Sequence, residues 1–266
     1  MKNRKFSAAL FRKLLLMFFI LLLIGIEIAF HILGFFDGLG VNAYNAAVRF
    51  VGGAVCIIFM IEFSYHAVLS PLGNKKILAL IAILPAFAVA INNFPFVSFF
   101  AGACNIGADI AEILIFGLFC LSVGFFEEMA FRGCMLMFFL RKRSNTKGGI
   151  FIAILLSSAA FGLIHLVNLF TSSPAAVLLQ IGYSALIGGL CSLVLLTTKN
   201  IWLCVLIHAV YNFAGGIVPE FGSGVIWTVP EIIFTAIVAV TVTVYSVWLF
   251  IKLPVANASE LYNKNK

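Results

Sequence analysis

The chain carries too little charge for a soluble protein. Only 10% of its 266 residues are charged, whereas 63% are hydrophobic. Soluble domains average roughly 25% charged and about 45–50% apolar residues, and no water-soluble core absorbs this much apolar surface. The 29 phenylalanines also need a dry environment. These proportions exclude an ordinary soluble domain and predict an integral membrane protein whose main partner is the lipid bilayer.

Metal and disulfide motifs are missing as well. The six cysteines form no CxxC pair and no Cys/His pair with zinc-finger spacing, which argues against a disulfide framework or a structural zinc site. The HExxH motif of many zinc peptidases is also absent. There is no long linker, internal repeat or low-complexity tract. We therefore expect one transmembrane domain covering residues 1–266.

What the chain does contain is a series of long apolar segments. A bilayer span takes about 20 mainly apolar residues, and eight segments approach or exceed that length. The predicted fold is all-α, a polytopic bundle of about eight transmembrane helices. We interpret the first segment as a retained helix, because it is longer than the roughly 7–15 apolar residues of a signal peptide. The third is short, and the fourth is long enough to begin with an interfacial turn. The predicted spans are 14–34, 44–69, 77–91, 109–140, 150–170, 175–197, 201–217 and 231–251.

Positive charge is concentrated in alternate loops. With the N-terminus inside, 15 of the 17 basic residues fall in segments predicted to be cytoplasmic, and only Arg49 and Arg132 fall elsewhere. This distribution follows the positive-inside rule and predicts that both termini are cytoplasmic. The net charge of +7 is thus a topology signal rather than a sign of nucleic-acid binding. Short loops without organelle targeting favour a bacterial plasma membrane, and no residue specifies an oligomeric state.

Glu127, Glu128 and Arg132 lie close together within the fourth span. An ionisable side chain at a helix centre costs roughly 2.5–3.5 kcal/mol on insertion scales and is a functional candidate. Glu127 and Glu128 are expected to face different ways, because successive helical residues point about 100° apart. Glu128 can pair with Arg132 at i,i+4, which leaves Glu127 without a local partner. A buried, unpaired carboxylate suits a general base working near neutral pH.

Further polar residues occur on the fifth and seventh spans. His165 lies on the fifth, while His208 and Asn212 share a face of the seventh at i,i+4 spacing. At a rise of ~1.5 Å per residue, these three and Glu127 lie roughly 12–22 Å from the cytoplasmic ends of their helices. The sequence therefore predicts one site at a common depth in the membrane.

Hydrolysis is the chemistry that this set of residues favours. Glu127 would take a proton from water, with His165 positioning that water, and His208 and Asn212 would stabilise the oxyanion. Alternatively, Glu127, His165 and His208 would supply three ligands to a catalytic Zn²⁺ and leave a fourth position for water. The residues permit a metal without demanding one.

The spacing of these residues also resembles a known family. Glu127-Glu128-x-x-x-Arg132, Phe161-x-x-x-His165 and His208-x-x-x-Asn212 follow one another on successive apolar segments. They resemble the three motifs of the CAAX-protease and bacteriocin-processing (CPBP, or Abi) intramembrane proteases, over about residues 116–216. The resemblance implies a helical bundle around a membrane-embedded chamber that cleaves peptide bonds. It implies Glu127 as the base, the two histidines and Asn212 completing the site, and Glu128 with Arg132 supporting it. It leaves open the choice between a metal and glutamate-activated water.

Our first hypothesis is an intramembrane endopeptidase that opens toward the cytoplasm and acts on a peptide or membrane-tethered protein. A proton-coupled transporter would also use buried acids, but it predicts inverted repeats or broken helices in corresponding halves, and neither is evident. A non-catalytic immunity or scaffold protein is the third hypothesis, and it would tolerate loss of Glu127. A polar network that only holds helices together is a further alternative.

Overall fold

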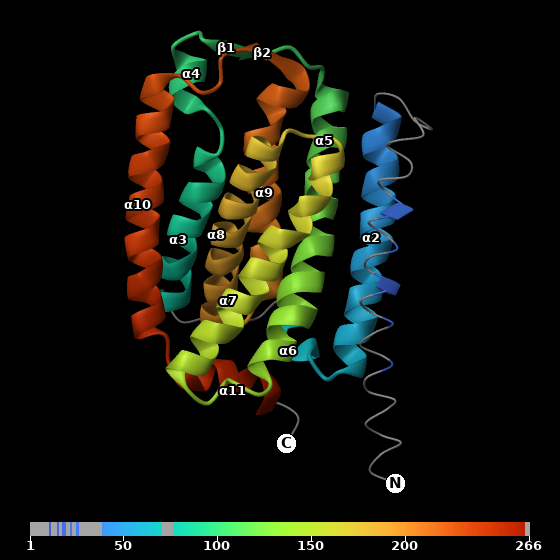
Figure 1. The fold of residues 1–266 in the computed structure, drawn as a ribbon, viewed down its shortest axis with the longest axis vertical. Helices are drawn as coiled ribbons and strands as arrows, with labels where there is room; N and C mark the ends of the chain where they lie inside the picture. The colour runs from blue at the N-terminus through green and yellow to red at the C-terminus, as the bar shows by residue number, and fades with distance from the viewer. Residues whose placement is uncertain are drawn as a thin grey trace.

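The structure is a computed structural model that describes residues 39–70 and 77–263, together with a few positions between 11 and 26. The predicted first span, 14–34, lies almost entirely outside the described residues. In the described part, long helices run side by side along one axis, with α10 at one edge of the bundle and α2 at the other (Figure 1). These helices are α2 (Leu39–Glu62), α3 (Ile77–Asn92), α5 (Ile110–Glu128), α7 (Lys147–Leu163), α8 (Pro174–Thr198), α9 (Ile201–Phe221) and α10 (Val229–Lys252).

The polytopic helical membrane fold is confirmed, but the count of eight spans is not. Six helical stretches of the described chain are long and apolar enough to cross a membrane, and α3 contributes a shorter apolar stretch, Ile83–Asn92. The orientation of the termini stays a prediction. The six stretches are Gly40–Glu62, Ile110–Leu140, Lys147–Phe170, Pro174–Thr198, Ile201–Phe221 and Val229–Lys252.

The second predicted span was drawn too far toward the C-terminus. Helix α2 ends at Glu62, because Ser64 adopts a left-handed conformation with φ 61°. The amide of Tyr65 then donates to the carbonyl of Met60, and that of Ser64 to Ile61. This pair of bonds is a Schellman C-cap. The chain continues as a 3₁₀ turn, η1 (His66–Leu69), instead of as membrane helix.

The fourth predicted span is one continuous helical stretch, Ile110–Leu140. It starts directly with a capping box, in which the side chain of Asp109 accepts from the amide of Glu112 and the side chain of Glu112 accepts from that of Asp109. Helix α5 continues into a π-helix, η2 (Met129–Leu136), and a short α6 (Met137–Leu140). π-helical turns are rare and frequently occur at functional sites. This one starts immediately after the two glutamates.

Short elements close the two ends of the bundle. At one end, β1 (Cys104–Ile106) pairs antiparallel with β2 (Gly222–Gly224), beside α4 (Phe96–Phe100), and the all-α prediction did not include this strand pair. The strands come so close that a Cβ at Gly222 would lie 2.1 Å from the carbonyl oxygen of Asn105. Helix α11 (Val255–Asn263) lies at the opposite end (Figure 1).

Close helix contacts bring the polar residues together. Helix α5 packs between α2 and α9. At Gly124 it approaches α9 so tightly that a Cβ would lie 2.7 Å from the carbonyl oxygen of Val205. Helices α7 and α8 pack equally closely at Gly162, where a Cβ would lie 2.7 Å from the carbonyl oxygen of Ile181. Small residues of this kind let membrane helices approach at backbone distance.

Candidate active site

His208 lies between the two glutamates. Its Nδ1 is 2.8 Å from Oε1 of Glu128, and its Nε2 is 3.5 Å from Oε2 of Glu127. The two carboxylates therefore approach different edges of one imidazole ring. The expectation that Glu127 is unpaired is wrong, because its partner comes from α9 and not from its own helix. Glu128 is fully buried and His208 nearly so, whereas the side chain of Glu127 remains 21% exposed.

Arg132 holds the buried Glu128 from the other side. Its Nη1 lies 3.0 Å from Oε1 of Glu128, which confirms the predicted i,i+4 pair. The guanidinium also lies over the ring of Phe161, 4.4 Å from its centroid, a cation–π contact. Gly188 on α8 leaves room for it, since a Cβ there would come 2.9 Å from Nη2. Apart from the ion pair, no nitrogen of Arg132 has a hydrogen-bond partner among the described residues.

Phe161 is the residue at the centre of this cluster. Its ring is 2% exposed and meets the rings of His165 and His208 edge-on, at centroid distances of 5.4 and 5.6 Å. Sequence reasoning used Phe161 only as part of a motif and did not predict this role. The feature of the sequence that could have indicated this contact is the i,i+4 spacing between Phe161 and His165.

His165 follows α7 in a 3₁₀ segment, η3 (Ile164–Phe170). Its Nδ1 lies 2.9 Å from the carbonyl oxygen of Phe161. Because a carbonyl only accepts, Nδ1 carries the proton and donates it, which leaves Nε2 as an acceptor in the neutral ring. The side chain is half-buried, so this acceptor is able to meet a water or a substrate.

Asn212 lies one helical turn after His208 on α9. Its side chain is half-buried and has no hydrogen bond to any other described residue. The neighbouring position is anchored, because the side-chain amide of Asn93 donates to the carbonyl of Tyr211 at 2.8 Å. Asn212 is therefore suited to bind a ligand, because the backbone beside it is anchored and its side-chain amide makes no hydrogen bond to another described residue.

The zinc site considered from the sequence does not fit this arrangement. In the part of the chain that the structure describes, no three His, Cys, Asp or Glu side chains are grouped to hold a metal ion. Both ring nitrogens of His208 are directed at carboxylates, and the ring of Phe161 contacts both histidines. Glu127, His165 and His208 therefore do not form a three-ligand set as they stand.

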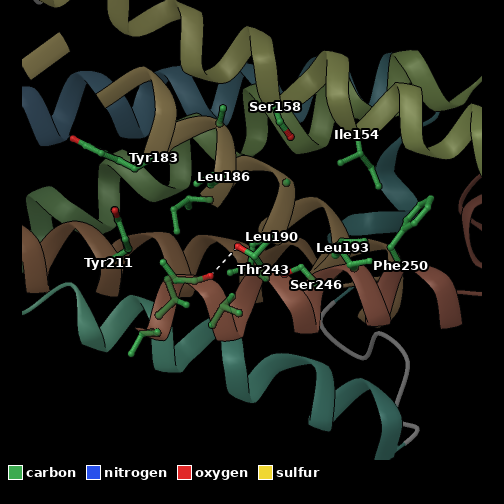
Figure 2. A pocket seen from close by; sticks show the side chains of 18 of the residues that line it. Ile154, Ser158, Tyr183, Leu186, Leu190, Leu193, Tyr211, Thr243, Ser246 and Phe250 are labelled. Atoms are coloured by element: carbon green, nitrogen blue, oxygen red, sulfur yellow. Dashed lines mark hydrogen bonds between the residues drawn. The ribbon is translucent and has the colours of Figure 1, made fainter. Parts of the chain in front are cut away.

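An apolar cavity of about 500 Å³ lies beside the cluster, between α3, α7, α8, α9 and α10. Figure 2 shows Tyr183 and Tyr211 at one end of it and Phe250 at the other. Tyr211 directly precedes Asn212. Ser158 also lines the cavity, and its hydroxyl is buried without a hydrogen-bond partner among the described residues. A concave apolar space with a few polar groups is the usual form of a ligand site.

Residues 109–214 match the family described as type II CAAX prenyl endopeptidase, Rce1-like. This segment, 106 of the 266 residues, is similar to the CAAX-protease (CPBP) family. The resemblance drawn from the three motifs is thereby confirmed, and the matched segment contains every predicted site residue. No curated protein and no solved structure matches the chain. In this CAAX-protease-like segment, the motif residues lie on α5, η2, α7, η3 and α9.

Proposed function

We propose that the chain is an intramembrane endopeptidase that hydrolyses a peptide bond in a peptide or membrane-tethered protein, with water activated by Glu127. The observation that carries the proposal is the line Arg132–Glu128–His208–Glu127, whose first three members are buried and which lies within the matched segment. Placing two carboxylates, a guanidinium and an imidazole together is costly in a membrane protein, and such groups usually have a function.

Glu127 is the proposed general base. Its side chain is the more accessible of the two carboxylates, so it is the one that water and substrate reach. His165 presents an acceptor nitrogen that orients the attacking water, and the side-chain amide of Asn212 donates to the developing oxyanion. The apolar cavity, which Tyr211 lines, holds apolar residues of the substrate in this proposal.

The mechanism takes no step through a metal ion. The described side chains offer no three-ligand set, and His208 has carboxylate partners on both ring nitrogens. Glutamate-activated water is therefore the version of the reaction that this arrangement supports best.

The test is proteolysis of a peptide library by detergent-purified protein. Glu127→Ala and His165→Ala are expected to abolish the cleavage seen with wild type, and a chelator is expected to leave it unchanged. Glu112→Ala is the matched control, because Glu112 is a partly exposed glutamate in the first turn of the same α5 helix. Equal cleavage by wild type and Glu127→Ala would refute the proposed function.

A further inference from the structure

The apolar cavity carries its amide and phenol side chains at one end. The ring centroids of Tyr183 and Tyr211 lie 6.3 Å apart at this end (Figure 2). Asn92 and Asn93, at the C-terminal end of α3, line the same cavity. Asn93 lies at the tyrosine end, because its side chain bonds to the backbone of Tyr211. A bound ligand is therefore expected to place its hydrogen-bonding groups here and its apolar groups toward Phe250.

The side chain of Asn93 is held in one orientation. Its Nδ2 donates to the carbonyl oxygen of Tyr211 at 2.8 Å, and the nitrogen must face this oxygen because a carbonyl only accepts. The same side chain fills the notch that Gly215 leaves in α9. A Cβ at Gly215 would lie 2.1 Å from Nδ2 of Asn93 but 3.3 Å from Oδ1. The amide therefore enters the notch nitrogen first, and Oδ1 is the atom farther from Gly215.

The side-chain oxygen of Asn93 is free to accept a hydrogen bond. No described residue donates to Oδ1. Asn93 is half-buried, and Oδ1 retains accessible surface, whereas the unpaired hydroxyl of Ser158 in the same cavity is fully buried. Because the bond to Tyr211 already orders the side chain, binding a donor at Oδ1 costs little additional conformational entropy.

A peptide N–H is the donor that this position suits. A substrate segment that unwinds in apolar surroundings leaves backbone N–H groups without partners, which is costly unless the protein supplies an acceptor. The carbonyl to which Asn93 bonds belongs to the peptide group that joins Tyr211 to Asn212. The free acceptor therefore lies beside the backbone of the residue proposed to bind the oxyanion, and a substrate bound at Asn212 is within reach of Asn93.

We infer that Asn93 is a substrate-binding residue, whose Oδ1 accepts a hydrogen bond from one backbone N–H of the substrate near the scissile bond. The inference rests on the proposed function and adds a specificity to it. The substrate must be extended at this point, because the N–H of a helical residue is already bonded within its own chain. A proline at the bound position is disfavoured, since it has no N–H to donate.

The experiment compares a cleaved peptide with analogues in which an ester replaces one backbone amide at a time, other than the scissile one. Each analogue lacks a single N–H. For wild type, one analogue should have kcat/KM lowered by about 2–10-fold, the effect of one neutral hydrogen bond. Asn93→Leu, which keeps the size of the side chain but has no acceptor, should lower kcat/KM for the parent peptide by a similar factor. In this variant the same ester should cause no further loss.

A second variant moves Asn93 without replacing it. In Gly215→Ala the new Cβ would lie 2.1 Å from Nδ2 of Asn93, so the side chain must leave the notch. This variant should also stop distinguishing the parent peptide from the ester analogue. Gly216→Ala is the matched control on the same helix, because its Cβ meets the ring of Phe116 instead, and it should keep the wild-type ratio.

The ratio of kcat/KM for parent and ester does not depend on how much of a variant is folded. If Asn93→Leu lowers kcat/KM for every peptide by one factor and keeps the wild-type ratio, Asn93 only holds α9 in place and the inference is overturned. It is also overturned if wild type cleaves every ester analogue as well as the parent peptide. If wild type cleaves no peptide at all, the proposed endopeptidase itself fails.

Discussion

Arg132→Met is expected to destabilise the protein strongly, because it leaves Glu128 without its cation. Glu128 is fully buried, and its Oε2 has no hydrogen-bond partner among the described residues. After the substitution, His208 still contacts this carboxylate. Methionine fills most of the space beside Phe161, and a sulfur–aromatic contact replaces part of the cation–π contact. Arg132→Met therefore tests the loss of the positive charge more than the loss of packing contacts.

The magnitude follows from the burial of both partners. Removing one member of a buried ion pair costs about 3–5 kcal/mol, whereas replacing both members is often close to neutral. We expect a loss in this range for Arg132→Met and recovery of most of it in the double variant Glu128→Gln with Arg132→Met. The double variant should still lack proteolytic activity, because His208 has lost its anionic partner.

The assay is reversible unfolding of the purified protein in mixed detergent micelles, followed by far-ultraviolet circular dichroism. Glu260→Gln is the matched control, since it breaks the ion pair between Lys199 and Glu260, in which Glu260 is 54% exposed. Exposed pairs contribute about 0–1 kcal/mol. The reasoning fails if Arg132→Met costs no more than Glu260→Gln, or if the double variant is no more stable than Arg132→Met alone.

Three further predictions concern packing around the site. Lys147→Met should lower the free energy of unfolding by about 1–3 kcal/mol, because the ammonium of Lys147 donates to three backbone carbonyls at the end of α10; an unfolding curve equal to wild type would contradict this. Ala239→Trp should raise KM for an apolar substrate by filling the cavity that Ala239 lines. Ile237→Trp changes an exposed position of the same helix and should leave KM unchanged. Equal KM values in the two variants would show that the cavity does not bind substrate. Gly124→Leu should abolish proteolysis by forcing α5 away from α9. Gly148→Ala is the control and should leave proteolysis unchanged, because a Cβ at Gly148 meets no atom within 4 Å. Unchanged activity in Gly124→Leu would refute the need for this close contact.

The sequence alone determined the fold class, most helix positions and the resemblance to a known family. A bilayer requires long apolar helices with internally satisfied backbone groups, so hydropathy locates them within a few residues. The span predicted at 201–217 is α9, Ile201–Phe221. The pair of Glu128 and Arg132 was also predictable, because i,i+4 contacts depend only on local helix geometry.

The tertiary structure decided which motif residues meet. No local rule places His208 against both Glu127 and Glu128, since this contact depends on how closely α5 packs on α9 at Gly124. The strand pair β1–β2 likewise joins residues more than 100 positions apart. A helical period fixes the relation between neighbours on one helix, whereas the rotation and depth of one helix against another are set by the packing of side chains that are distant in the sequence. The line Arg132–Glu128–His208–Glu127 follows from that packing.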